Sequence, residues 1–117
     1  MEKIHQSSLS IHHLEEDKKK NLYNTIYSLL NDGGIFINAD QMLSPDKEIE
    51  ELFIRLWKED ILNSGLELEE AEKAFERMKL DKPSKLSDQL QWLKNAGFIK
   101  SDCLYKYRNF CTIYGKK

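Results

Sequence analysis

Apolar residues along the first third of the chain follow two different periods. Between residues 16 and 30 they recur at i, i+4, i+7 and i+8, which places them on one helix face: Leu22, Ile26, Leu29 and Leu30. Residues 35–37 are Ile-Phe-Ile, a short bulky run typical of a strand buried on both faces. Gly33 and Gly34 separate the two patterns, and glycine ends helices because it takes positive φ without a Cβ clash. The stretch therefore predicts a helix, a glycine turn and a strand over residues 35–38.

A second strand is expected before this helix. Residues 3–11 contain the strand formers Ile4, Leu9 and Ile11, and residues 12–14 follow as a loop. Strand, helix and strand in this order form a βαβ unit, whose two strands run parallel and whose crossover is right-handed. We therefore expect residues 4–9 and 35–38 to lie side by side and to point the same way.

The middle of the chain predicts three more helices. Ser44 as N-cap and Pro45 at the first helical position indicate where the first of them begins. Apolar stripes at helical spacing predict the other two, over about residues 67–79 and 85–96. Gly97 is the expected stop of the last helix.

The chain ends in a predicted β-hairpin. Residues 98–114 are rich in aromatic and β-branched side chains, and Arg108-Asn109 is the expected turn. The predicted order is β-α-β-α-α-α-β-β, an α/β fold in which an antiparallel hairpin extends a parallel pair. No glycine-rich phosphate loop such as G-x-G-x-x-G occurs in the sequence.

Composition limits the class of protein. The 117 residues, 40% hydrophobic and 32% charged, fit a single soluble domain. A net charge of -2 argues against nucleic-acid binding through bulk basicity, and we interpret Lys18, Lys19 and Lys20 as a solvated face. No apolar run approaches the roughly 20 residues that cross a bilayer, and the first residues lack the apolar core of a signal peptide. We therefore expect a cytoplasmic protein that does not bind a membrane. Cys103 and Cys111 match neither a CxxC motif nor a zinc spacing, so no metal site is predicted.

Three short motifs, in this order, resemble one enzyme family. They are Ser-Leu-Ser-Ile-His-His-Leu at residues 8–14, Leu-Asn-Asp-Gly-Gly-Ile-Phe at residues 30–36 and Leu-Lys-Asn-Ala-Gly-Phe at residues 93–98. With the closing aromatic hairpin, they look like the C-terminal half of a class I S-adenosylmethionine-dependent methyltransferase. In that family they match the fourth strand and its loop, the turn before the fifth strand, and the joint before the last two strands. The resemblance implies a partial Rossmann-like sheet with helices packed on it.

The helical stretch of residues 44–83 and the ending at residues 105–110 resemble a small subgroup of this family, related to the carboxy-S-adenosylmethionine synthase of tRNA wobble-uridine modification. The family's first strand, its glycine-rich loop and the acidic residue that holds the ribose have no counterpart here. We therefore expect residues 1–117 to be a truncated fragment that lacks the cofactor-binding half. Such a fragment would neither bind S-adenosylmethionine usefully nor act as an enzyme alone.

The resemblance also implies a site. Ser8, Leu9 and Ser10 would flank the methionine part of the cofactor. His12 and His13 would lie at the mouth of the site, where one of them orients or deprotonates a substrate. The alternative is that one histidine packs against the next helix and the other is solvated.

Two further residues are candidates for substrate contact. Asp40 ends the predicted strand at the edge where open α/β sheets bind ligands, and it either contacts substrate or caps a loop through an Asx turn. Arg108 in the hairpin turn either contacts substrate or a partner, or is an ordinary surface arginine.

The implied function is methyl transfer to an unknown acceptor. The alternatives are a non-enzymatic α/β interaction or oligomerisation module, and a helical protein-binding domain with no parallel sheet. Because the strand partner known from the family is missing, the segment from Lys3 to Ser10 presents an open edge. We expect it either to pair with the same segment of another copy, which would give an oligomer, or to be disordered.

Overall fold

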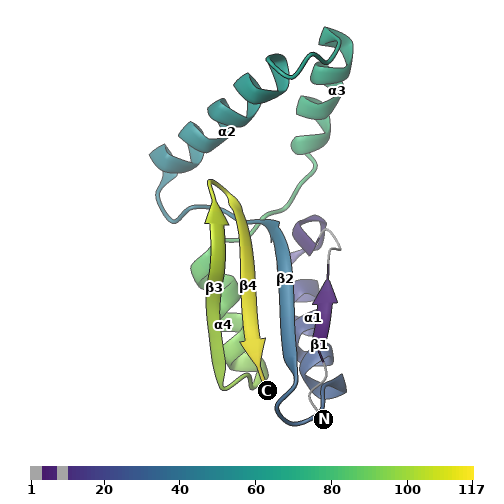
Figure 1. Ribbon diagram of the computed structural model, residues 1–117, viewed down its shortest axis with the longest axis vertical. Helices are drawn as coiled ribbons and strands as arrows, with labels where there is room; N and C mark the ends of the chain where they lie inside the picture. Colours follow the sequence, from purple (N-terminus) through teal and green to yellow (C-terminus); the bar gives the residue numbers. More distant parts are fainter. Residues whose placement is uncertain (1–3, 8–10) are drawn as a thin grey trace.

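The structure is a computed structural model that describes the backbone of residues 4–7 and all of residues 11–117. Its elements follow the predicted α/β order (Figure 1). They are β1 (Ile4–Ser7), the short 3₁₀ helix η1 (Ile11–His13), α1 (Glu16–Leu29), β2 (Ile35–Gln41), α2 (Lys47–Leu62), α3 (Leu68–Met78), α4 (Leu86–Ala96), β3 (Lys100–Tyr107) and β4 (Phe110–Lys116).

The described strands form one mixed sheet in the order β1-β2-β4-β3. β1 pairs with β2 in parallel, with Ile4 opposite Ile35, so the predicted βαβ unit is confirmed. β4 lies antiparallel between β2 and β3, and Arg108-Asn109 is the hairpin turn, as predicted. β1 is the edge strand of this sheet, and self-association through the segment from Lys3 to Ser10 stays a prediction.

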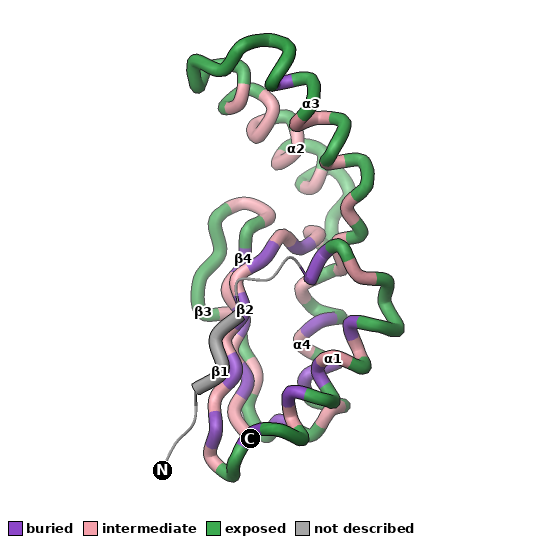
Figure 2. Tube along the Cα trace, turned by 90° about the vertical axis from the view of Figure 1, so that its right-hand side faces the viewer, coloured by how far each residue is buried: buried purple, intermediate pink, exposed green. Residues whose placement is uncertain are grey.

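Helices α1 and α4 pack on one face of the sheet (Figure 2). Along β2 every second residue is buried against them, so Phe36 is fully buried while Ile35 and Ile37 are half-buried. The prediction that this strand is buried on both faces is therefore wrong, because in the described part of the chain helices cover only one face of the sheet. The core between the layers includes Tyr23, Ile26, Phe36, Trp92, Leu93, Phe98 and Ile113.

Helices α2 and α3 form an arm, defined as residues 47–78, that extends beyond the sheet (Figure 1). The body is the remainder: the sheet with η1, α1 and α4. No residue of α2 is buried, and Ala71 is the only buried residue of α3. The two helices touch through Trp57 and Phe75, whose rings meet edge to face at 5.7 Å. None of the described helices has the length and apolar character needed to cross a membrane.

Several predicted boundaries need correction. α2 begins at Lys47, and Asp46 is its N-cap because its carboxylate accepts a hydrogen bond from the Ile49 backbone N–H at 3.1 Å. Ser44 and Pro45 therefore precede the helix. Ile11, expected at the end of the first strand, begins η1, and β2 continues past residue 38 to Gln41.

Gly97 ends α4 as predicted, with φ at +120°. A Cβ at this position would lie 2.6 Å from Cζ of Tyr27. The Tyr27 ring also meets Phe98 edge to face at 5.2 Å. Glycine is thus required here both by backbone conformation and by the close approach of α1.

Candidate functional site

Three segments meet at the carboxyl end of β2: η1, the residues after β2, and the chain that returns from α3. The returning chain is fixed by backbone hydrogen bonds, from Lys82 N–H to the His12 carbonyl at 2.7 Å and from Leu43 N–H to the Ser84 carbonyl at 2.9 Å. The carboxyl edge of a parallel pair is where open α/β sheets bind ligands. The topology therefore brings η1 and the residues near 81 to the edge at which the sequence placed Asp40.

His12 and Asp40 form a buried pair at this edge. The Asp40 side chain accepts a 2.8 Å hydrogen bond from the His12 backbone N–H, and its other oxygen bonds Nδ1 of the His12 ring. That oxygen also accepts from the Gln41 backbone N–H at 2.8 Å. A carboxylate can only accept, so this bond assigns the proton to Nδ1, and Nε2 of the neutral ring keeps its lone pair. Asp40 therefore fixes both the position and the tautomer of His12.

A second carboxylate, Asp81, lies on the other side of the ring. Its Oδ1 is 3.5 Å from His12 Nε2 and 3.2 Å from His13 Nδ1, and the two histidine rings are 4.1 Å apart. The Asp81 side chain is mostly buried, whereas that of His13 is half exposed. No local pattern points to Asp81, because the return of the chain from the arm brings it beside the histidines.

Lys19 supports the same cluster from α1. It is fully buried, and its ammonium donates to the Ser84 hydroxyl at 2.7 Å and to the Lys82 carbonyl. Burial lowers the pKa of Lys19, while Asp40 and Glu16 act to raise it. The prediction that Lys19 belongs to a solvated face is wrong. Because its donors need acceptors that only the returning chain offers, it ties α1 to that chain.

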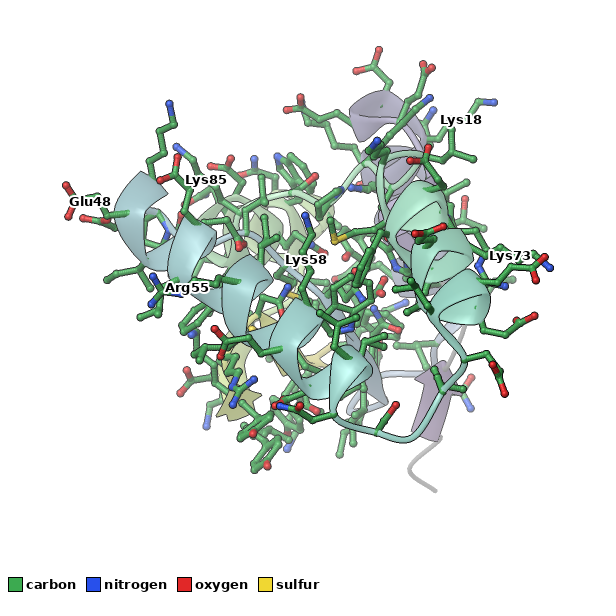
Figure 3. The ribbon with its side chains drawn as sticks, turned by 90° about the horizontal axis from the view of Figure 1, so that it is seen from above. Lys18, Glu48, Arg55, Lys58, Lys73 and Lys85 are labelled. Atoms are coloured by element: carbon green, nitrogen blue, oxygen red, sulfur yellow. The ribbon has the colours of Figure 1, made fainter. Side chains whose placement is uncertain are left out.

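A cavity of about 260 Å³ opens beside the two histidines, between the body and the arm. The body contributes His12, His13, Gln41 and Asp81, and the arm contributes Trp57, Ala74, Arg77 and Met78. Seen from above, the arm directs Glu48 and Lys73 outward, whereas Lys58 lies between its two helices, 5.5 Å from the Phe75 ring (Figure 3). The cavity therefore combines a fixed imidazole, a carboxylate, an arginine and apolar side chains on its walls.

The structure brings together His12, His13 and Asp40 but places Arg108 elsewhere. Arg108 adopts the left-handed conformation, with φ at +54°, and donates a 2.7 Å hydrogen bond to Asp60 of α2. It therefore links the hairpin tip to the arm. Ser8, Leu9 and Ser10, expected at the cofactor, lie outside the described residues.

No protein-family profile matches the chain. Its sequence is similar to curated carboxy-S-adenosyl-L-methionine synthases, with 32% identity over 103 residues to that of Campylobacter lari and 30% over 103 residues to that of Staphylococcus epidermidis. These matches cover 86% and 87% of this chain but 43% and 45% of the relatives. The chain thus spans less than half the length of the relatives it matches.

Solved methyltransferases share the fold. PigF, solved with SAH, superimposes with a TM-score of 0.66 at 19% identity, covering 97% of this chain and 30% of PigF. Human N-acetylserotonin methyltransferase with SAM gives a TM-score of 0.60 at 14% identity, over 97% and 29% of the two chains. The resemblance to S-adenosylmethionine-dependent methyltransferases is therefore confirmed, in sequence by the synthases and in fold by these structures.

Proposed function

We propose that this chain forms the acceptor side of an S-adenosylmethionine-dependent transferase site, in which His12 is the general base. The observation that carries the proposal is the bond between Asp40 and Nδ1 of His12, which leaves the lone pair on Nε2, beside the cavity and 3.5 Å from Asp81 Oδ1. The sequence similarity to the synthases and the methyltransferase fold support the choice of cofactor.

Methyl transfer is an in-line displacement at the sulfonium methyl carbon. A nucleophilic oxygen or nitrogen of the acceptor forms the new bond to carbon, and the carbon–sulfur bond breaks to leave a neutral thioether. The acceptor proton passes to Nε2 of His12, and the buried Asp40 carboxylate stabilises the imidazolium that results. Arg77, on the wall of the same cavity, would hold an anionic part of the acceptor.

The test is transfer of a labelled methyl group from S-adenosylmethionine to a panel of hydroxyl and amine acceptors. The assay uses this chain joined to the cofactor-binding half of a related synthase, because we expect residues 1–117 alone to bind the cofactor too weakly. His12→Gln should lower the transfer rate by about 10²–10⁴-fold, the usual contribution of a general base. His5→Gln, a histidine in β1, should leave the rate unchanged. Equal rates for wild type and His12→Gln would overturn the role of His12, and no transfer by wild type would favour the interaction-module alternative.

A second candidate reaction follows from the relatives and from Arg77. The named relatives are carboxy-S-adenosyl-L-methionine synthases, whose product carries an added carboxyl group. A carboxylate donor would find a counter-charge at Arg77, beside both histidines. In this reaction the sulfonium methyl group would lose a proton, the donor would lose its carboxyl group as CO₂ and take up a proton in its place, and the methyl carbon would form the new bond to CO₂. To test this reaction, the protein of the methyl-transfer assay is incubated with S-adenosylmethionine and small carboxylic acids, and mass spectrometry detects the carboxylated product. Arg77→Gln should abolish the carboxylated product, and Arg55→Gln, an exposed arginine on the arm, should not.

A further inference from the structure

One donor atom from each of His12, His13 and Asp81 lies within 4.8 Å of the other two. His12 Nε2 lies 3.5 Å from Asp81 Oδ1, and His13 Nδ1 lies 3.2 Å from the same oxygen. A tetrahedral zinc ion holds its ligands at about 2.0–2.2 Å, which places the ligand atoms about 3.3–3.6 Å from one another. We propose that these three side chains bind one divalent transition-metal ion, of the class of Zn²⁺ or Co²⁺.

Metal-binding histidines usually donate their second ring N–H to a carboxylate or carbonyl, and Asp40 accepts this hydrogen bond from His12. Its carboxylate bonds Nδ1 of His12, so it directs Nε2 toward Asp81. The ligands are also held relative to one another, because the Lys82 N–H donates to the His12 carbonyl at 2.7 Å. The donor atoms of the two histidines lie within 4.8 Å of one another, so binding an ion requires the half-exposed His13 ring to turn toward His12.

The donor set selects the kind of ion. Two imidazoles and one carboxylate suit zinc, cobalt or iron, whereas calcium and magnesium prefer sites built from oxygen alone. Three protein ligands leave a fourth coordination position, and the cavity beside His12 and His13 provides room for it. In metalloproteins such an open position takes water or a substrate atom.

This inference goes beyond the proposed function and does not rest on it. An ion on Nε2 of His12 occupies the lone pair that proton transfer requires. The metal-loaded chain therefore cannot use His12 as a base, and added metal should inhibit any transfer that depends on it. Metal binding and group transfer can thus fail or succeed separately.

The experiment is a titration of the chain with Co²⁺, followed by its visible absorption, and with Zn²⁺, followed by calorimetry. We expect one ion per chain, the intense bands of four-coordinate cobalt, and proton release that depends on pH. His13→Gln should remove the cobalt bands, and because His13 is exposed this variant should keep its fold, as circular dichroism will show. His5→Gln is the matched control and should bind like wild type.

Asp40→Asn tests the contact between Asp40 and Nδ1 of His12. It keeps all three ligands but weakens the carboxylate contact to Nδ1, so metal affinity should fall by about 10–100-fold. Absence of saturable binding to wild type would overturn the proposal. Equal binding by wild type and His13→Gln would also overturn it, because the ion would then lie elsewhere.

Discussion

The body and the arm are built in opposite ways, and the candidate site lies where they meet. The body has a continuous aromatic core, in which the Tyr23 and Phe36 rings are 5.8 Å apart. The arm has one buried residue, Ala71, and holds together through partly exposed contacts such as that of Trp57 with Phe75. The body therefore supplies the fixed groups His12 and Asp40, and the arm supplies a wall of the cavity and has few buried residues of its own.

The largest contrast should come from truncating one aromatic side chain in each region. Phe36→Ala removes a fully buried ring and should lower the free energy of unfolding by about 3–5 kcal/mol. Phe75→Ala removes a partly exposed ring from the arm and should cost about 1–2 kcal/mol. Urea denaturation of both variants measures the difference, and equal losses would mean that the arm shares the core of the body.

The two helix-ending glycines give a matched pair. Gly97 and Gly65 both have positive φ, but a Cβ at Gly97 would clash with Tyr27 whereas one at Gly65 meets nothing within 4 Å. Gly97→Ala in the body should cost about 2–4 kcal/mol, and Gly65→Ala in the arm about 1 kcal/mol, the backbone term alone. Thermal unfolding of the two variants compares them. A cost at Gly65 as large as that at Gly97 would contradict the packing described for α4.

Alkaline pH should affect stability through the body. Burial, with the neighbouring Cys103, raises the pKa of the Cys111 thiol to about 11. The unfolded thiol ionises near 8.5, so this group's stabilisation is complete below that pH and is lost as pH rises toward 11, by about 3 kcal/mol. Cys111→Val should flatten this part of the stability curve, measured under reducing conditions. An unchanged slope would show that Cys111 does not contribute.

The smallest effect is expected at an exposed ion pair between the two regions. Asp60 of α2 accepts from Arg108 of the hairpin turn at 2.7 Å, but the Asp60 side chain is 63% exposed. Water and salt screen such a pair, so Asp60→Asn should change stability by at most about 1 kcal/mol. Denaturation at low and high salt would measure it. A larger, salt-independent loss would mean that this contact, and not the returning chain, holds the arm.

Local patterns were enough to predict most of the body. The stripe in α1, the glycine turn and the bulky run of β2 each depend on neighbours in sequence, and the βαβ rule then fixed their parallel pairing. These local patterns do not predict which side chains meet in the tertiary structure. Lys19 looks solvated in a run of three lysines. It can be buried because the Ser84 hydroxyl and the Lys82 carbonyl accept hydrogen bonds from its ammonium group.

Local patterns also predict some residues of the candidate site but not the contacts between them. His12 and Asp40 were found from motif order and from strand position, but their mutual contact was not, since 28 residues separate them. Asp81 carried no local signal, because it follows a helix in a polar segment and reaches the histidines only through the return from the arm. The hydroxyl of Ser44 followed by Pro45 fits the N-cap pattern, but Asp46 makes the capping bond.

The state of the His12 ring tests the central claim most directly. Nitrogen-15 NMR of the metal-free chain, at a pH where the ring is neutral, reports which ring nitrogen carries the proton. The contact with Asp40 predicts the proton on Nδ1 and a bare Nε2 for His12. A proton on Nε2 would show that Asp40 does not hold the ring, and both the proposed base and the proposed metal ligand would then be contradicted.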